Sequence, residues 1–557
     1  MSRVSQRAVD VGVPGGAGGP GRLILLASCW LALAGNLPMW RTIWPLPELA
    51  GWRGVLFAGG VVVWIAAALT MLLSLLAWKR LLKPVLLLLL FTAAVSSYFM
   101  QQYGVVIDAT MLANVANTDV REVRDLMSWS LLLHIVLIAV LPCWWLLRQP
   151  VAMRRVGLQA ARNLVGAALA LLVLLGVTLL VFQDLASLMR NHKQVRYLVN
   201  PLNTLYAAGK LALDQGSQAG RSLQPIGLDA RLGPTHAAGR RTPLVVLVVG
   251  ETARAANFSL GGYERKTNPE LEQLAAQGPE LTYYSAVRSC GTNTQVSLPC
   301  MFSHLGRGAF EAGRQPAENL VDVLQRAGLA VLWVDNQAGC KGLCDRVVQF
   351  NTFDLKTPGL CTSDECFDEI LLADLDQRIA ALEPARRARG VVMVLHQMGS
   401  HGPAYHKRVP PAYKTFVPEC SSSVLQDCAR QELVNAYDNT LVYTDHLLAS
   451  LVRWLAAQGA RDTAMVYVSD HGESLGENNL YLHGMPYALA PDTQTHVPML
   501  SWVSTAMAQR LQLRPDCLRR NAGAALSHDN LFHAMLGLLD VQTGLYQREL
   551  DWFAACR

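Results

Sequence analysis

The sequence predicts a membrane-anchored α/β protein, with a five-helix transmembrane domain followed by a soluble α/β domain that has a mostly parallel sheet. Residues 22–183 contain apolar runs of membrane-spanning length. After residue 240 the chain alternates strand-like and helix-like stretches, as α/β domains do. Two of these strand-like runs end on side chains that bind metals, which predicts a site at one edge of the sheet.

Five apolar runs in the first half are each close to the roughly 20 residues that cross a bilayer as a helix. They lie at 22–40, 54–78, 84–101, 129–147 and 162–183. Basic residues precede the first run and fill the turns after the second and the fourth, and the positive-inside rule places such segments in the cytoplasm. We therefore expect a cytoplasmic N-terminal tail at 1–21, and everything after residue 183 on the opposite side of the membrane.

The segment 184–240 is predicted to be an interfacial helix and a linker. Residues 184–213 have the pattern of an amphipathic connector whose basic side chains contact lipid phosphates. These basic side chains are Arg190, His192, Lys193 and Arg196. Scattered Gly, Pro and Ser residues over 214–241 indicate the linker into the second domain, 241–557.

The second domain is expected to place its strands and helices in alternation. Strands are predicted at 244–250, 329–335, 390–396, 464–469 and 496–503, and helices near 366–382 and 430–457. Eight of its cysteines fall in close pairs, which favours disulfides in an exported domain. The pairs are Cys290 with Cys300, Cys340 with Cys344, Cys361 with Cys366, and Cys420 with Cys428. A zinc cluster is the alternative, but no pair has finger spacing with matching histidines, and Cys517 and Cys556 stay unassigned.

Three side chains at strand ends are the candidate metal ligands. Glu251 follows the first strand, and Asp470 and His471 follow the fourth. A buried strand that ends on an acid delivers it to the carboxyl edge of a parallel sheet, where open α/β folds bind their ligands. With the oxygen of Thr294 they would form a tetrahedral zinc site. For Asp470 and His471 alone, a turn and helix cap is the alternative.

Thr294 is the candidate nucleophile. It lies in the polar turn 289–300, which the predicted Cys290–Cys300 disulfide would enclose. If a helix begins at this turn, its free N–H groups would favour a phosphate-bearing intermediate there. A threonine hydroxyl is a poor nucleophile at neutral pH, and a metal would activate it. The alternative is an ordinary helix cap.

Further polar side chains are candidates for substrate contact. His396, His401 and His483 follow strands, and with Lys341 they could line a phosphate site or hold a second metal ion. Asn114, Thr118 and Glu122 are spaced by four, which predicts one helix face, either solvated or in contact with a lipid headgroup. The remaining histidines of the second domain are interpreted as structural or surface residues, among them His406, His446, His496, His528 and His533.

At these motifs the chain resembles the phosphoethanolamine transferases that modify lipid A. They are a membrane branch of the alkaline phosphatase and sulfatase superfamily that includes the mobile colistin-resistance enzymes. The segments that carry the resemblance are 249–254, 289–300, 399–403, 437–440, 469–478 and 483–484. The resemblance implies an alkaline-phosphatase-like soluble domain in the periplasm, anchored in the bacterial inner membrane.

The resemblance also implies roles for individual residues. Thr294 would be the phosphorylated nucleophile, and Glu251, Asp470 and His471 would join it as zinc ligands, with Glu473 and His396 packed around them. One zinc ion is expected, with room for a second. The side chains implied to face the substrate are Lys341, His401, His483, Asn114, Thr118 and Glu122.

The function implied is transfer of phosphoethanolamine from phosphatidylethanolamine to a lipid A phosphate. A phosphothreonine would form, diacylglycerol would leave, and the modified surface would resist polymyxins and cationic peptides. A monomer is expected, and the net charge of +6, much of it in the membrane turns, does not indicate a nucleic-acid partner. The alternatives are a transferase acting on a core sugar or another glycan, a phosphoglycerol transferase, a simple hydrolase, and an inactive sensor.

Overall fold

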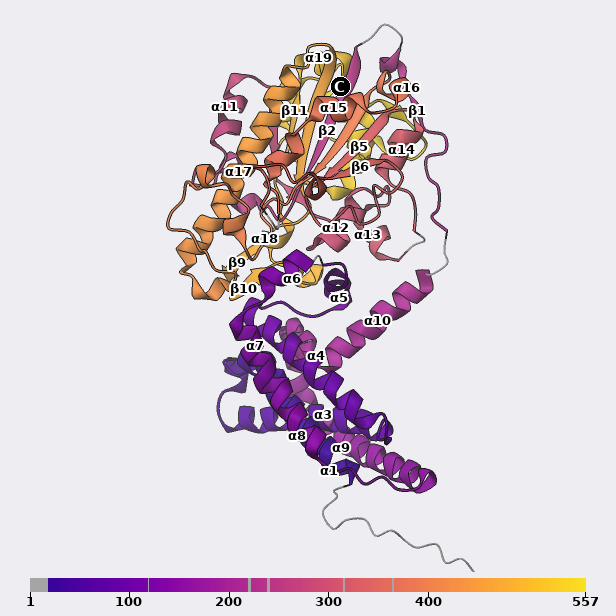
Figure 1. The fold of residues 1–557 in the computed structure, drawn as a ribbon, viewed down its shortest axis with the longest axis vertical. Coiled ribbons are helices and arrows are strands. Elements are labelled where there is room, and N and C mark those ends of the chain that lie inside the picture. Colours follow the sequence, from indigo (N-terminus) through magenta and orange to yellow (C-terminus); the bar gives the residue numbers. More distant parts are fainter. Residues whose placement is uncertain (1–18, 119, 219–221, 238–240, 314–315, 363–364) are drawn as a thin grey trace, which may run out of the picture. The chain divides into compact units, whose positions relative to one another are not determined.

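The computed structural model describes residues 19–557 except 119, 219–221, 238–240, 314–315 and 363–364 (Figure 1). Nearly all of the predicted tail, 1–21, lies outside the described residues. The chain divides into two compact units. The first comprises residues up to 102 with 106–108 and 127–209, and the second comprises 103–105, 109–126 and 210–557. The segment 109–126 therefore belongs to the second unit, although it lies between two spans in sequence.

The first unit contains, within the described residues, five helical segments long and apolar enough to cross a membrane, as predicted. They are Pro20–Ile43, Trp52–Leu75 (α3), Leu82–Tyr103 (α4), Trp129–Arg148 and Val156–Asn191 (α9). The first consists of α1 (Pro20–Leu33) and α2 (Leu37–Ile43), and the fourth of α7 (Trp129–Ile135) and α8 (Leu141–Arg148) joined by a π-helical turn. The fifth runs past its predicted end into the expected connector, because residues 184–191 contain neither Gly nor Pro to stop it. A 3-10 turn at Lys193–Leu198 and α10 (Leu202–Gln218) follow.

A close approach of two spans shows how the first unit is held together. A Cβ added at Gly60 of α3 would lie 2.8 Å from a methyl group of Val181 on α9. One turn further along α3, the indole N–H of Trp64 donates to the hydroxyl of Thr178 at 3.0 Å. A small residue and an interhelical hydrogen bond are the usual means of packing helices in lipid, where no hydrophobic force draws them together.

The second unit is built on a seven-stranded sheet with the strand order β3-β11-β8-β2-β7-β5-β6. The strands are β2 (Thr242–Gly250), β3 (Leu281–Tyr284), β5 (Ala330–Asp335), β6 (Val348–Asn351), β7 (Val391–His396), β8 (Arg461–Ser469) and β11 (Met499–Val503). Only β11 runs against the others, so the sheet is mostly parallel, as predicted. The edge strands β3 and β6 were not predicted, because each has four residues and β6 is largely exposed.

The second unit also contains helices and small two-stranded pairs (Figure 1). The helices are α5 (Ala109–Ala116), α6 (Val120–Leu126), α11 (Pro269–Gln277), α12 (Thr294–Met301), α13 (Gly306–Glu311), α14 (Leu320–Arg326), α15 (Leu375–Ala380), α16 (Pro384–Arg387), α17 (Arg430–Ala456), α18 (Asp492–Thr495), α19 (Thr505–Leu511), α20 (Pro515–Arg520) and α21 (Leu531–Leu538). The pairs are β1 (Arg231–Leu232) with β13 (Val541–Gln542), β4 (Val287–Arg288) with β12 (Leu526–Ser527), and β9 (Ser474–Glu477) with β10 (Leu480–Leu482).

The core has two layers because side chains alternate across the strands. On β2, Val245, Leu247 and Val249 pack with α12, α14, α19 and α21. Leu244, Val246 and Val248 face the other way and pack with α17. Every residue of β2 after Thr242 is buried, as expected for a central parallel strand covered on both faces.

Two local predictions were wrong. The helix expected near 366–382 is a 3-10 turn, Asp368–Leu372, followed by α15, because Asp374 adopts a left-handed conformation (φ 54°) that interrupts a right-handed helix. The single helix face expected for Asn114, Thr118 and Glu122 does not exist either. Thr118 follows the end of α5, and its hydroxyl donates to the Asn114 carbonyl at 2.8 Å, a bond that competes with helix continuation. Glu122 lies on the next helix, α6.

The structure contains the four predicted disulfides, Cys290–Cys300, Cys340–Cys344, Cys361–Cys366 and Cys420–Cys428. A fifth joins Cys517 to Cys556, the pair that the sequence left unassigned. Its partners are 39 residues apart, so it does not share the short spacing of the others.

Candidate active site

Two neighbouring strands deliver three candidate ligands to the same edge of the sheet. β2 and β8 are parallel and paired from Thr242 with Arg461 to Gly250 with Ser469. The next residues, Glu251 and Asp470, therefore leave the sheet side by side, and His471 follows. All three side chains are fully buried, with 0% exposure. Their ligand atoms lie within 4.8 Å of one another and form a possible metal-binding group.

Thr294 completes this group from the first position of α12. Its Oγ1 lies 3.1 and 3.2 Å from the two carboxylate oxygens of Glu251 and 3.4 Å from Nε2 of His471. A helix does begin at this turn, where the side chain of Asn293 caps it by accepting the N–H of Val296 at 3.0 Å. The structure thus brings all four predicted zinc-site residues together.

The hydrogen bonds of Asp470 and His471 leave Oδ2 of Asp470 and Nε2 of His471 available to bind a metal ion in this group. Oδ1 of Asp470 accepts the N–H groups of Thr252 and His471 at 3.2 and 2.7 Å, while its buried Oδ2 has no hydrogen-bond partner among the described residues. Nδ1 of His471 donates to the Gly472 carbonyl at 2.9 Å. This bond orients Nε2 toward the site in the way that metal-binding histidines are usually held.

The electrostatics of the group fit a divalent cation. Burial and the adjacent charge of Glu251 raise the pKa of Asp470 to about 6. Burial lowers the pKa of His471, but the charge of Asp470 and the hydrogen bond with Glu251 raise it to about 9. The two buried carboxylates therefore require a positive charge near Nε2 of His471. A zinc ion in place of that proton would balance the same charge, and two carboxylates, an imidazole and a hydroxyl are ordinary zinc ligands.

His396 stands beside the group and is held by Asp335. Its Nδ1 lies 2.9 Å from Oδ2 of Asp335, and its Nε2 lies 4.0 Å from Oε2 of Glu251. Asp335 and His396 are paired at the ends of β5 and β7. Sequence reasoning missed Asp335, although the signal was the same as for Glu251, an acid at the end of an apolar strand.

His401, His483 and Glu473 form a second layer of polar groups in the same unit. The ring of His483 lies 4.4 Å from that of His471 and 5.6 Å from that of His401, measured between centroids. Nδ1 of His483 lies 3.3 Å from Oε1 of Glu473. Burial raises the pKa of Glu473 to about 8. Burial, with the charges of His471 and His401, holds the pKa of His483 well below its usual range.

Glu122 of α6 reaches this layer from the segment between the third and fourth spans. Its Oε1 lies 3.8 Å from Nε2 of His401. Helix α5 contacts α12, and a Cβ added at Gly484 would lie 2.5 Å from the Met111 methyl group on α5. Helix α5, which carries Asn114, therefore packs against α12 and beside Gly484, while α6 brings Glu122 to His401.

Lys341 is not joined to this cluster by a described contact. Lys341 lies inside the loop closed by Cys340 and Cys344, and its Nζ donates to the carbonyl of Ala338, just before that loop, at 3.2 Å. Thr118 likewise uses its hydroxyl within its own segment, on the Asn114 carbonyl. The roles of these two residues toward a substrate stay predictions.

Comparison with known proteins assigns the family. A model described as phosphoethanolamine transferase EptA/EptB matches residues 65–215, and one described as sulfatase matches 243–541. The chain is 39% identical to phosphoethanolamine transferase EptA of Escherichia coli K12 over 96% of both chains. The chain belongs to the phosphoethanolamine transferase family. Within this family it is also 38% identical to phosphatidylethanolamine transferase Mcr-1 of Escherichia coli, over 93% of this chain and 94% of Mcr-1.

Solved structures support the phosphoethanolamine transferase fold. The integral membrane protein lipooligosaccharide phosphoethanolamine transferase A of Neisseria meningitidis superposes with a TM-score of 0.90 at 35% identity, covering 97% of this chain and 99% of that one. Its soluble domain, solved alone, is 42% identical and covers 60% of this chain with a TM-score of 0.56. The chain is accordingly a multi-pass inner-membrane protein with an alkaline-phosphatase-like soluble domain.

Proposed function

We propose that this chain transfers phosphoethanolamine from phosphatidylethanolamine to a phosphate of lipid A through a phosphothreonine at Thr294. The observation that carries the proposal is the position of the Thr294 hydroxyl, 3.1 Å from Glu251 and 3.4 Å from His471, in a member of a transferase family. A nucleophile at the first position of a helix also lies where backbone N–H groups favour a phosphate.

In the first half-reaction, Thr294 gives up its hydroxyl proton to the layer formed by His401, His483 and Glu473, and its oxygen attacks the phosphorus of the donor lipid. The bond to the diacylglycerol oxygen breaks, and diacylglycerol leaves once that oxygen gains a proton. Glu251, Asp470, His471 and Thr294 would hold one zinc ion, which would lower the pKa of the threonine hydroxyl and neutralise charge on the phosphoryl oxygens.

His401 is the residue we assign to protonate the leaving oxygen. Burial lowers its pKa, but the charges of Glu122, Glu251 and Glu473 outweigh this and raise it. His483 stays neutral beside it and can orient the transferred group. In the second half-reaction a phosphate oxygen of lipid A attacks the phosphothreonine, the threonine oxygen leaves, and its proton returns from the same layer of residues.

The topology that suits this reaction places the N-terminus in the cytoplasm and the soluble unit in the periplasm. Both substrates are lipids, so anchoring the site in the membrane keeps them within reach. The product carries an added amine and one fewer free phosphate charge, which weakens the attraction of polymyxins and other cationic peptides. Transfer to a core sugar or another glycan is the alternative, because the same residues would serve it.

Mass spectrometry of lipid A tests the proposal. Cells expressing the intact chain should contain lipid A with an added phosphoethanolamine mass, and cells expressing the Thr294→Ala variant at equal level should not. The same mass found on the core oligosaccharide, with lipid A unmodified, would support the alternative acceptor. Added phosphoethanolamine in the Thr294→Ala strain would refute the phosphothreonine route.

A further inference from the structure

His528 lies beside the nucleophile turn because two short strands run in parallel. β12 pairs with β4 in the register Leu526 with Val287 and Ser527 with Arg288. The residues that follow, His528 and Ser289, therefore start side by side. A capping box fixes the backbone here, since Ser527 Oγ accepts the Asp529 N–H at 3.2 Å and Asn530 Oδ1 accepts the Ser527 N–H at 2.8 Å.

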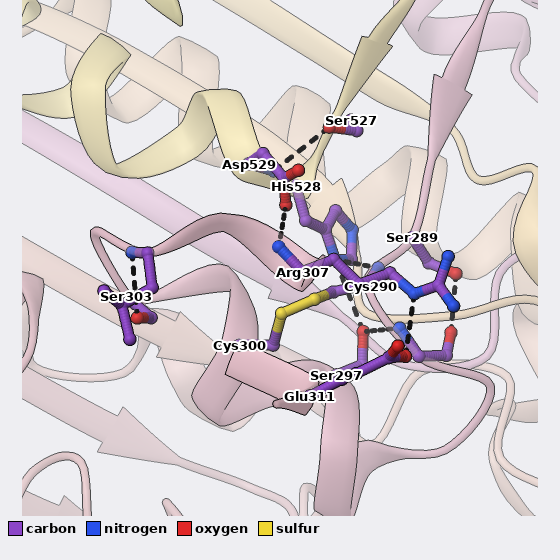
Figure 2. Close-up of a disulfide and its surroundings, with 12 residues drawn as sticks. Ser289, Cys290, Ser297, Cys300, Ser303, Arg307, Glu311, Ser527, His528 and Asp529 are labelled. Atoms are coloured by element: carbon purple, nitrogen blue, oxygen red, sulfur yellow. Dashed lines mark hydrogen bonds and ion pairs between the residues drawn. A yellow bond between two sulfur atoms is a disulfide. The ribbon is translucent and has the colours of Figure 1, made fainter. Parts of the chain in front are cut away.

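The buried ring of His528 joins the nucleophile turn to the end of β8. Its Nδ1 accepts the backbone N–H of Cys290 at 3.0 Å, and its Nε2 donates to the Ser469 carbonyl at 3.0 Å. Figure 2 shows this ring next to the Cys290–Cys300 disulfide. One nitrogen accepts and the other donates, so the ring is neutral, and burial lowers its pKa to about 4.

Ser297 makes a second connection between the same two segments. It lies one turn into α12, and its hydroxyl donates to the carbonyl of Asp470. The same oxygen accepts the N–H of Gly291 at 3.3 Å, within the turn. Ser297 is fully buried, with 0% exposure. Ser297 is thus bonded directly to the Asp470 carbonyl, and Cys290 is linked to the Ser469 carbonyl through His528, next to the candidate metal ligands.

We propose that His528 and Ser297 are positioning residues for the Thr294 nucleophile. They hold the turn and the start of α12 against the end of β8, and so keep the Thr294 hydroxyl within reach of Glu251 and His471. Neither residue touches a reacting atom. The expected effect on kcat rests on the proposed function. The expected shift of the Thr294 turn does not depend on any substrate.

Two substitutions divide the bonds of His528. In His528→Gln the amide nitrogen can still donate to Ser469, but the Cys290 N–H loses its acceptor. In His528→Asn the amide oxygen can still accept from Cys290, but Ser469 loses its donor. His533→Gln is the matched control, because His533 is equally buried, on α21, and its Nδ1 accepts the Gln547 N–H at 3.2 Å, away from the site.

The test is the kinetics of the zinc-loaded full-length variants with phosphatidylethanolamine in mixed micelles. We expect kcat to fall roughly 10- to 100-fold in both His528 variants and in Ser297→Ala, since a small misplacement of a reacting group has effects of this size. KM for phosphatidylethanolamine and the pH dependence of kcat should stay as in the wild type. The kcat of the control His533→Gln should stay within roughly twofold of the wild-type value. Equal kcat in the His528 variants and the control would overturn the inference, as would loss of one pH limb, which indicates proton transfer.

A crystal structure of the full-length His528→Gln variant tests the inference without a substrate. The turn should move so that Thr294 Oγ1 lies farther from His471 Nε2 than the present 3.4 Å. An unmoved turn would overturn the inference. If the wild type itself transfers no phosphoethanolamine, the proposed function fails, and the displaced turn alone still decides whether these residues position Thr294.

Discussion

The hydroxyl of Thr294 lies 3.1 Å from the carboxylate of Glu251, although 43 residues separate them in sequence. The first residue of α12 and the residue after β2 meet because the turn before α12 crosses the carboxyl edge of the sheet. This contact makes a threonine in a polar loop a candidate nucleophile.

Substitution of Thr294 should separate loss of the hydroxyl from loss of the fold. Thr294→Ala should lower transfer roughly 10⁴-fold or more, because no covalent intermediate can form. Thr294→Ser keeps a hydroxyl at the start of α12 and should keep measurable transfer. Intact-protein mass spectrometry of rapidly quenched enzyme should detect the phosphoethanolamine adduct in the wild type and in Thr294→Ser. An adduct on Thr294→Ala would contradict the assignment.

Removal of a ligand charge should weaken zinc binding. Glu251→Gln and Asp470→Asn should each bind zinc at least roughly 100-fold more weakly. Substituting a residue that only hydrogen-bonds to a metal ligand already lowers metal affinity by roughly 10- to 100-fold. Competition with a chromophoric chelator measures this affinity. Glu272→Gln, which loses an ion pair with Lys266 outside the site, is the control and should bind zinc like the wild type. Unchanged affinity in both ligand variants would exclude this site.

The contact between Glu122 and His401 should set one limb of the pH profile. His401 acts in its protonated form, so kcat should fall as the pH rises through its pKa. The charge of Glu122 raises that pKa. Glu122→Gln should therefore move this alkaline limb to lower pH. Asp125→Asn, which removes the α6 ion pairs with Lys407 and Arg408, should leave the limb in place. A limb that stays fixed in Glu122→Gln would assign the proton to another group.

Acid should destabilise the wild type partly through His528. Its pKa is about 4 in the folded protein and near 6.5 when exposed, so the unfolded chain takes up a proton first as the pH falls. The resulting stabilisation is present above pH 6.5 and is lost between about pH 6.5 and 4, by roughly 3 kcal/mol. Thermal unfolding of the zinc-loaded protein should show a smaller decrease of Tm over this range in His528→Gln. Equal decreases would mean that His528 is not held neutral.

The membrane spans and the ligand-bearing strand ends could be predicted because each depends on a short window of sequence. A run of about 20 apolar residues spans a bilayer whatever it packs against. Glu251, Asp470 and His471 each follow an apolar run, and parallel pairing then brings them to one edge. Asp335 follows the same rule and was still missed.

The break between α5 and α6 could not be predicted in the same way. The spacing of Asn114, Thr118 and Glu122 fits a continuous helix, and periodicity does not reveal a side chain that bonds to the backbone instead. The helix expected near 366–382 failed for a similar reason, since the left-handed conformation of Asp374 is not apparent from its residue type.

The sequence by itself determined the two-part architecture and the central strands, and it singled out Thr294, Glu251, Asp470 and His471 as candidates, because these follow from composition and from local order along the chain. Only the tertiary structure decided how Thr294 is held. His528 is hydrogen-bonded to Cys290, 238 residues away in sequence, and Cys517 forms a disulfide with Cys556, 39 residues away. Hydrogen bonds and disulfides between distant segments depend on distances of a few ångströms, which exist only after the strands have paired and the helices have packed.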